Sequence, residues 1–427
     1  MIVALDLGST SIKAALYNGK LKELAQHSVP LPHIFADGGT VEIDPGVVRA
    51  ALAKAVRGCL KAAGRSSKVG GIAITSQAQT FTILSRSGRP RMNFISWQDG
   101  RAVGACAALS KMRSMKDFAS YGSFGSLIPG LQICHLKRLG DLGTGPGGGE
   151  AALLLPSWVA LLLTGARAID DNLAAMSGLY SLVEDGWKDS ALAAAGVRAT
   201  HLPEVVRSGR VFSRTGVGAG KFGLAAGIPV VFAGNDQTAG AYGAAVHEDN
   251  SVLVTLGTAQ VVYTMHASMP RPAAASIRGP YPGGLYYRMA ADSSGGSVIN
   301  WARHVLAGCG RSGSFFEAAA RATPGCNGLT FHVNGDGASY EWRGMGFQHG
   351  TPELARAILE SLSDRMVRMV KALGLATGGR PFKIAGGGSR FAVWRAILEA
   401  KLGTRLEMTD ASPLFGAARM ARDAGLS

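Results

Sequence analysis

Short apolar runs alternate with polar turns at the start of the chain. Residues 2–5 form an apolar run, and residues 12–17 form a second one after a turn of small and polar residues. This pattern predicts two strands joined by a tight turn. Asn18-Gly19 is a typical hairpin turn and leads into a third expected strand near residues 21–27.

A helix and a further strand follow this opening. Asp44 and Pro45 supply an N-cap and a proline at the first helical position, and apolar residues then recur at helical spacing. Gly64 ends the predicted helix, and residues 71–75 form the next apolar strand. Strands that alternate with helices predict an α/β domain.

The second half of the chain repeats this design. Residues 229–233 predict a strand that ends in Gly-Asn-Asp-Gln, and a helix of small residues follows. After the polar residues 247–250, residues 251–263 again show a strand, a Leu-Gly-Thr turn and a strand. We therefore expect two related domains, at residues 1–246 and 247–427. The second domain continues with an amphipathic helix, a strand and a further helix, at residues 354–373, 381–385 and 394–401.

Composition excludes a disordered chain, because 47% of the residues are apolar and 17% are charged. Lysine and arginine exceed aspartate and glutamate by 44 to 29, which gives a net charge of +15. Such a charge suits nucleic acid, a membrane surface or small anions. Because the charges are scattered, we expect a solvated basic surface, with neither nucleic acid nor a membrane as a partner.

Cysteine usage and the first residues predict a cytoplasmic protein. The five cysteines are odd in number, widely spaced and free of CxxC pairs, so a disulfide framework or a structural zinc site is not expected. Met1 leads straight into a strand pattern, without the features of an export signal. The most apolar run, residues 151–163, is too short to span a bilayer, and we interpret it as a buried helix.

Two turns have a composition that suits phosphate, and a third lets the backbone approach a ligand closely. Glycine leaves backbone N–H groups accessible, and hydroxyls add donors. In the first turn Asp6 precedes these groups, and since a carboxylate repels phosphate, its presence suggests a bridging magnesium ion. An ordinary polar hairpin is the alternative. The groups concerned are Gly8, Ser9, Thr10 and Ser11 in the first turn, Gly257 and Thr258 in the second, and Gly386-Gly387-Gly388-Ser389 in the third.

Two other places combine polar groups in a way that suggests chemistry. Asp236 follows an apolar strand and precedes a helix, where open α/β sheets carry reactive groups, although a helix N-cap is the alternative. The segment Trp97-Gln98-Asp99-Gly100-Arg101 suits a polyol, whose hydroxyls need donors, acceptors and a flat apolar face. A surface turn with a local ion pair would explain it equally. Gln77 and Gln79, at a strand end, are expected to join the same pocket.

Nucleotide-binding motifs of other families do not fit. No GxxxxGK[ST] phosphate loop occurs in the sequence. Residues 218–223 match GxGxxG, but they precede a strand instead of following one, so we do not interpret them as a dinucleotide-binding loop.

Six motifs, taken in order, resemble those of the FGGY carbohydrate kinases, and the resemblance runs nearly end to end. It implies two actin-like (ribonuclease H-like) domains with the active-site cleft between them. It also implies ATP and Mg²⁺, a small-molecule sugar substrate, and phosphorylation of a terminal ketose hydroxyl. A homodimer is compatible with it. The motifs are Leu5 to Lys13, Thr75-Ser76-Gln77, Trp97 to Arg101, Gly234-Asn235-Asp236-Gln237, Leu256-Gly257-Thr258 and Gly386 to Ser389.

The resemblance also implies a role for each matching residue. Asp6 would hold magnesium, and Asp236 would be the general base, its ionised form favoured by the helix N-terminus. Phosphate contacts are implied for Gly8, Ser9, Thr10, Ser11, Lys13, Gly257 and Thr258, and the adenosine site for Gly386, Gly387, Gly388 and Ser389. Sugar contacts are implied for Gln77, Gln79, Trp97, Asp99, Arg101 and Asp236.

Within the family, the motifs look most like the sedoheptulokinase and xylulokinase branches, which favours a pentulose or heptulose such as xylulose or sedoheptulose. Two departures stand out. Gln77-Ala78-Gln79-Thr80 occurs where a xylulokinase usually has Gln-Met-His-Gly, and Gly234-Asn235 replaces a commoner glycine pair. Two alternatives stay open at this point: an actin- or chaperone-like ATPase without sugar transfer, and a kinase for another polyol such as glycerol or ribulose.

Overall fold

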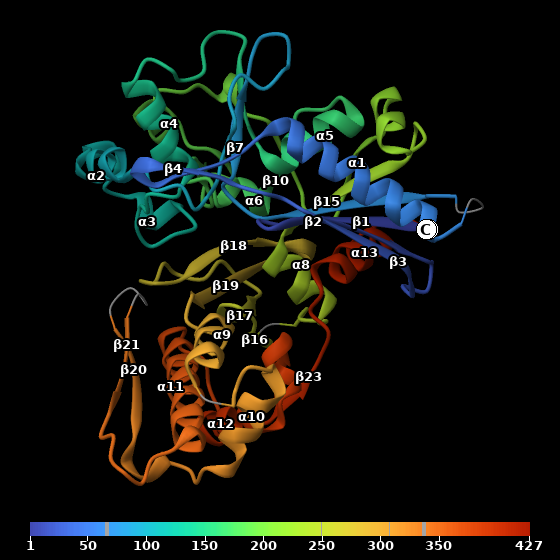
Figure 1. Ribbon diagram of the computed structural model, residues 1–427. Coiled ribbons are helices and arrows are strands. Elements are labelled where there is room, and N and C mark those ends of the chain that lie inside the picture. Colours follow the sequence, from blue (N-terminus) through green and yellow to red (C-terminus); the bar gives the residue numbers. More distant parts are fainter. Residues whose placement is uncertain (65–67, 249, 307, 335–338) are drawn as a thin grey trace. The chain divides into compact units, whose positions relative to one another are not determined.

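The structure is a computed structural model that describes residues 1–64, 68–248, 250–306, 308–334 and 339–427. Their contacts divide the chain into two compact units, each of which can be followed in Figure 1. The first unit comprises three segments of the chain and the second comprises two. These are Met1–Ala245, Ala267–Tyr287 and Ala411–Ser427 for the first, and Val246–His266 and Arg288–Asp410 for the second.

The expected boundary at residues 246/247 falls where the chain first passes between the units. A single boundary does not describe the compact units, because two later segments belong to the first one. The last segment carries helix α13 (Pro413–Asp423), which packs on the first unit's sheet. How sugar and nucleotide binding divide between the two domains stays a prediction.

Six strands form the main sheet of the first unit, in the order β14-β15-β6-β1-β2-β3. β1 pairs in parallel with β6, and β6 pairs in parallel with β15, whereas β1, β2 and β3 are antiparallel neighbours. The carboxyl ends of β1, β6 and β15 therefore meet at one edge of the sheet. The strands are Val211–Arg214 (β14), Pro229–Asn235 (β15), Gly71–Ser76 (β6), Ile2–Leu7 (β1), Ser11–Tyr17 (β2) and Glu23–Pro30 (β3).

Alternate residues of β1 face two different cores. Val3 and Leu5 pack with helices α1 and α5, whereas Ile2 and Ala4 pack with α13. Because the strand is covered on both faces, it is a continuous apolar run without alternation. Helix α1 comprises Pro45–Ala62, and helix α5 comprises Leu155–Thr164. The side chain of Asp44, the predicted N-cap of α1, accepts a hydrogen bond from Val47 N.

The second unit repeats the strand order of the first. Five neighbouring strands of a second six-stranded sheet have the order β19-β17-β16-β22-β23, which matches β3-β2-β1-β6-β15 position by position. β16 pairs antiparallel with β17 and parallel with β22, as β1 does with β2 and β6. The strands are Leu285–Asp292 (β19, whose first three residues are counted with the first unit), Gln260–His266 (β17), Val252–Leu256 (β16), Phe382–Ala385 (β22) and Leu406–Met408 (β23).

Helices cover this second sheet and confirm the amphipathic pattern of its sequence. Ile358, Leu362 and Met366 of α11 are fully buried at a spacing of four residues. They share one core with apolar residues of three other helices and of the sheet. The helices are Gly296–Val305 (α9), Ser312–Arg321 (α10), Thr351–Ala372 (α11) and Ala392–Leu402 (α12).

The expectation of one buried helix at residues 151–163 is wrong in its first part. Residues 151–154 form a strand that pairs antiparallel with β7 (Phe81–Leu84), and the helix α5 begins only at Leu155. Pro156 lies in its first turn, where the missing N–H is not needed. None of the described helices combines the length and apolar character of a membrane span. The strand at residues 151–154, β9, belongs to a smaller, five-stranded sheet of the first unit. That sheet has the order β4-β5-β8-β7-β9, formed by Ile34–Ala36, Thr40–Ile43, Phe94–Ile95, Phe81–Leu84 and Ala151–Leu154.

Helices α8 (Asp236–Gly243) and α13 pack with their backbones in contact. A Cβ atom on Gly416 of α13 would lie 1.7 Å from the carbonyl oxygen of Ala239 and 3.0 Å from Gly243 N. Backbone atoms cannot yield as a flexible side chain can. Glycine is therefore required at residue 416 by a close approach of two helices.

We expect Gly416→Ala to lower the free energy of unfolding by at least about 1–3 kcal/mol, because α8 must move to admit the methyl group. Urea unfolding measures the change. Gly104→Ala is a matched control, because Gly104 lies in a helix, α2 (Val103–Lys111), and no described atom lies within 4 Å of its Cβ position. That variant should keep or gain stability. Equal losses in both variants would contradict the proposed close packing.

Candidate active site

The first carboxylate of the site lies near the end of β1, one of the three parallel strands whose carboxyl ends meet at this edge. Asp6, near the end of β1, is 4% exposed and stands directly opposite Lys13 of β2. Lys13 Nζ lies 3.2 Å from Asp6 Oδ2. Asp6 Oδ1 is also buried, and no described residue gives it a hydrogen bond. One carboxylate oxygen is thus paired with a cation and the other is available.

The second carboxylate follows β15, two strands away in the same sheet. Asp236 is the first residue of α8 and is half-buried, and its Oδ1 accepts a 2.8 Å hydrogen bond from Gln237 N. The helix N-cap is Asn235, whose side chain accepts a 2.9 Å hydrogen bond from Thr238 N. The alternative that Asp236 is the N-cap is therefore wrong, because its neighbour fills that position.

The two carboxyl groups affect each other's environment. Burial and the charge of Asp6 raise the pKa of Asp236. Contacts with Gln237 and Lys13 lower it by less, so the pKa is about 6. Burial also raises the pKa of Asp6, against the attraction of Lys13. The expectation that the helix N-terminus would favour ionised Asp236 is wrong in its net effect, since burial and Asp6 outweigh it. A carboxyl group with a pKa near 6 can accept a proton at neutral pH.

The turn after β1 brings Gln77 to these groups. Gly8 N donates a 3.1 Å hydrogen bond to Ser11 O, which closes the predicted hairpin. Gln77 N donates to Leu7 O at 3.0 Å, and Gln77 Nε2 reaches Gly8 O at 3.4 Å. Its Oε1 is buried, and no partner for it exists among the described residues. Asp6, Lys13, Asp236 and Gln77 are thus brought together at one edge of the sheet, with Ser9 and Thr10 in the turn.

A second group of predicted residues surrounds Trp97, which is 45% exposed. Its backbone N donates a 3.2 Å hydrogen bond to Thr80 Oγ1, next to Gln79. Gly130 packs between these segments, since a Cβ there would lie 2.5 Å from Trp97 O and 3.7 Å from Gln79 Oε1. The structure therefore brings Gln79 and Trp97 together, as the sequence predicted.

Asp99 and Arg101 form the ion pair that the sequence left as an alternative. Asp99 is buried and accepts hydrogen bonds from Arg101 Nε at 2.9 Å and from Val41 N at 2.9 Å. Arg101 Nη2 also lies 2.6 Å from Glu42 Oε1, a partner that the sequence did not reveal. Burial raises the pKa of Asp99, but the hydrogen bonds from Arg101 and the backbone outweigh it and leave the pKa lowered. This carboxylate is already well satisfied within the protein.

Two polar residues of α4 (Gln132–Asp141) were missed from the sequence. Gln132 is fully buried, and neither amide atom has a hydrogen-bond partner in the described part of the chain. His135, one turn later, is also buried, with no hydrogen bond of good geometry to either ring nitrogen in the described part of the chain, and burial lowers its pKa to about 4 against the opposing effect of nearby Asp99. Its ring lies 6.3 Å from that of Phe81. Buried polar groups are normally paired, so these groups are candidates for ligand contacts.

In the second unit, the two glycine-rich turns are neighbours. β16 and β22 pair in parallel, and a Cβ on Gly386 would lie 2.5 Å from Leu256 O, directly before Gly257. Ser389 Oγ donates a 2.7 Å hydrogen bond to Gly386 O, so its hydroxyl closes the turn. Gly296 N, at the start of α9, donates a 2.8 Å hydrogen bond to Gly257 O. Gly295 and Gly296, where α9 begins, were not among the predicted residues, although adjacent glycines are typical of a place where two backbone segments come close.

Comparison of the sequence with known protein families identifies the family of this chain. Residues 1–243, more than half of the chain, match the N-terminal domain of the FGGY family of carbohydrate kinases. The chain belongs to the FGGY family. It is therefore a carbohydrate kinase, an enzyme that transfers a phosphoryl group to an alcohol and uses ATP as co-substrate.

Individual relatives of this FGGY kinase differ in their named substrates. It is 29% identical over 454 residues to a glycerol kinase of Alkalilimnicola ehrlichii. This match covers 100% of the present chain and 90% of the relative. It is 26% identical to the xylulose kinase of Escherichia coli, with coverage of 99% and 90%. The crystal structure of a xylulose kinase from Rhodospirillum rubrum matches with a TM-score of 0.89 at 24% identity, over 99% of this chain and 89% of that one. This likeness confirms the predicted fold of two actin-like domains.

The pKa of Asp236 generates a prediction about stability. Because the folded-state pKa, about 6, exceeds the ordinary value of 3.8, folded protein binds the proton more tightly than unfolded protein. Wild-type stability should therefore fall as pH rises from about 4 through 6, and Asp236→Asn should avoid that fall. We expect the variant to gain on the order of 2 kcal/mol relative to wild type between pH 4 and pH 7.5, measured by urea unfolding.

Asn235→Ala is the matched control for this measurement. It removes the hydrogen bond from Thr238 N and should lose about 1 kcal/mol at both pH values, as loss of an N-cap does. If Asp236→Asn behaved like Asn235→Ala, with an equal loss at both pH values, the raised pKa of Asp236 would be contradicted.

Proposed function

We propose that this FGGY kinase transfers the γ-phosphoryl group of ATP to a terminal hydroxyl of a ketose, a pentulose or heptulose such as xylulose or sedoheptulose. One observation carries the proposal: Asp236 has a pKa near 6 and begins a helix at the same sheet edge as Asp6. A sugar hydroxyl needs an acceptor for its proton as it attacks phosphorus. In this proposal, Asp236 takes that proton.

Asp6 would hold the magnesium ion that accompanies ATP. Its Oδ1 is a buried oxygen without a donor among the described residues, and hard cations prefer such carboxylate ligands. The described residues contain no cluster of three or more His, Cys, Asp or Glu that could enclose a metal. This fits magnesium, which is often bound by one or two carboxylates with phosphate oxygens and water. When bound, the ion would neutralise phosphate charge.

Protein groups would position the two substrates. Lys13 and the turn formed by Gly8, Ser9, Thr10 and Ser11 are proposed to contact phosphates in the first unit. Gly257 and Thr258 are proposed as a second phosphate contact, and Gly386, Gly387, Gly388 and Ser389 as the adenosine site. We propose sugar contacts from Gln77, Gln79, Trp97, Asp99, Arg101 and Asp236.

Two features of the described chain support a polar sugar site. The exposed face of Trp97 can cover the apolar face of a sugar, and unpartnered amide atoms of Gln77 and Gln132 can bind hydroxyls. Asp99 and Arg101 are tied to each other and to Glu42, so any contact from them would use the remaining donors of the guanidinium. A homodimer and a cytoplasmic location stay predictions.

Glycerol is the second candidate substrate, because a glycerol kinase is among the relatives that match the whole chain. Family membership speaks against the alternative of an actin- or chaperone-like ATPase without sugar transfer. A pentulose has one hydroxyl more than glycerol and a heptulose has three more, each besides a carbonyl oxygen, and each buried hydrogen bond adds roughly 1 kcal/mol of binding. The choice between these substrates therefore depends on how many hydroxyls the pocket engages.

A coupled ADP-release screen tests the proposed function. We expect kcat/KM on the better of xylulose and sedoheptulose to exceed that on glycerol at least about tenfold, equivalent to about 1.4 kcal/mol. A reversed order would establish the glycerol candidate instead. Absence of turnover on every polyol, with ATP and magnesium present, would contradict the proposal.

The role of Asp236 generates a separate prediction. Asp236→Asn preserves size and an oxygen that can accept the hydrogen bond from Gln237 N, but it removes the basic carboxylate. We expect kcat to fall about 10²–10⁴-fold, while both KM values stay within about threefold. Steady-state kinetics at saturating ATP measure the change. Near-normal kcat in the folded variant would place the base elsewhere.

A further inference from the structure

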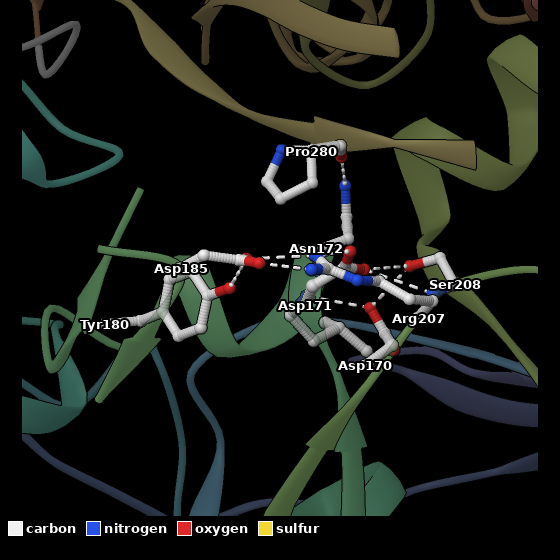
Figure 2. Close-up of polar contacts among 9 residues, drawn as sticks. Asp170, Asp171, Asn172, Tyr180, Asp185, Arg207, Ser208 and Pro280 are labelled. Carbon is white, nitrogen blue, oxygen red and sulfur yellow. Dashed lines mark hydrogen bonds and ion pairs between the residues drawn. The ribbon is translucent and has the colours of Figure 1, made fainter. Parts of the chain in front are cut away.

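Asn172 is a fully buried asparagine whose side chain is bonded on both sides. It lies in the short helix α6 (Asp171–Ala175) of the first unit. Its Oδ1 accepts a 2.9 Å hydrogen bond from Asn235 N. Its Nδ2 donates to Thr238 Oγ1 at 3.0 Å and to Pro280 O at 2.8 Å, and the last contact is visible in Figure 2.

These bonds close a ring around the turn that carries Asp236. Asn172 Oδ1 holds Asn235 N, Asn235 Oδ1 holds Thr238 N at 2.9 Å, and Thr238 Oγ1 accepts from Asn172 Nδ2. The ring contacts the residue before Asp236 and the residue two positions after it. The Asn172 amide therefore holds the backbone before Asp236 at Asn235 N and the side chain of Thr238 after it, while the Asn235 amide holds the backbone N of Thr238.

Two other features show how closely this turn is fitted. Gly234 has a φ of 70°, and a Cβ there would lie 3.0 Å from Asn172 Oδ1. Gly234 O accepts a 2.9 Å hydrogen bond from Thr75 Oγ1 of the neighbouring strand β6. The left-handed backbone at Gly234 thus brings the turn against Asn172 on one side and against the sheet on the other.

We infer that Asn172 is a positioning residue for the reaction, which orients Asp236 toward the sugar hydroxyl by fixing the turn from Gly234 to Thr238. The inference rests on the proposed role of Asp236. Asp236 Oδ1 is bonded to Gln237 N, its own backbone neighbour, so its direction follows that of the turn. A displacement of about 1 Å in a catalytic group can reduce the rate about 10²-fold.

A neighbouring residue offers a matched control. Ser208 is buried beside α6, and its Oγ donates to Asp170 Oδ1 at 3.0 Å and to Asp171 Oδ1 at 2.8 Å, as Figure 2 shows. Ser208→Ala therefore removes a buried hydroxyl whose single hydrogen is shared between two carboxylates next to Asn172, without touching the turn. It should lower the thermal midpoint but keep kcat within about twofold, since Asn172 keeps its own three bonds.

The test is a double-mutant cycle with Asp236→Asn, read as kcat and KM on the best sugar substrate. We expect Asn172→Ala to lower kcat about 10- to 100-fold, with both KM values within about threefold. In the Asp236→Asn background the same change should alter kcat by less than about twofold, because no base is left to orient. Should Asn172→Ala fail to fold, Thr238→Val removes one bond of the ring with little change of shape, and a three- to tenfold fall in kcat is expected.

The outcomes separate this inference from the proposed function. If Asp236→Asn lowers kcat but Asn172→Ala behaves like Ser208→Ala, the positioning role is overturned and the base stands. If Asn172→Ala lowers kcat by the same factor in both backgrounds, its effect does not pass through Asp236, and the inference is again overturned. Full turnover of Asp236→Asn alone would overturn the base and the positioning role together.

Discussion

The arrangement of the candidate site depends on two carboxyl groups held where the parallel strands of one mixed sheet end. Asp6 lies near the end of β1 and Asp236 directly follows β15, and strand β6 lies between these two strands. Burial raises the pKa of both, and Asp6 raises that of Asp236 further. Such a pair is unfavourable for folding at neutral pH, so the surrounding contacts must hold it in place. Lys13 stabilises Asp6, while Asn172 and Thr75 fix the turn beside Asp236.

The two units share a strand order but not the same charges. Aligning the Leu-Gly turns of the two opening hairpins places Thr255 at the position of Asp6 and Val261 at that of Lys13. The second hairpin thus keeps the turn and lacks the carboxylate and the cation. This difference is consistent with a proposed division in which the first unit carries proton transfer and metal binding. The second unit would then contribute glycine-rich turns for the nucleotide.

Local features of the fold could be predicted from the sequence because they depend on neighbouring residues. The hairpin at Gly8 and the helix capped by Asp44 both follow from such short patterns. The apolar run at residues 151–163 was ambiguous, because a buried strand and a buried helix have the same composition. Its first residues became β9 only because β7, about 70 residues earlier, is available to pair with them.

The contacts that shape the site are mostly long-range, and these were not predicted. Glu42 reaches Arg101 across 59 positions, and Asn172 reaches Asn235 across 63. No spacing rule connects residues so far apart, so the candidate residues could be named while their partners could not. The pKa of Asp236 was misjudged for the same reason, since the helix N-terminus is local but burial and Asp6 are not.

The central claim is that Asp236 is a carboxyl group poised to exchange a proton just below neutral pH. A direct measurement is an NMR titration of protein labelled with ¹³C at the aspartate carboxyl carbon, in which the Asp236 signal is identified by its loss in Asp236→Asn. The account predicts a titration midpoint near the value of about 6 that burial and Asp6 impose. A midpoint near 4, the ordinary value for an exposed aspartate, would contradict it.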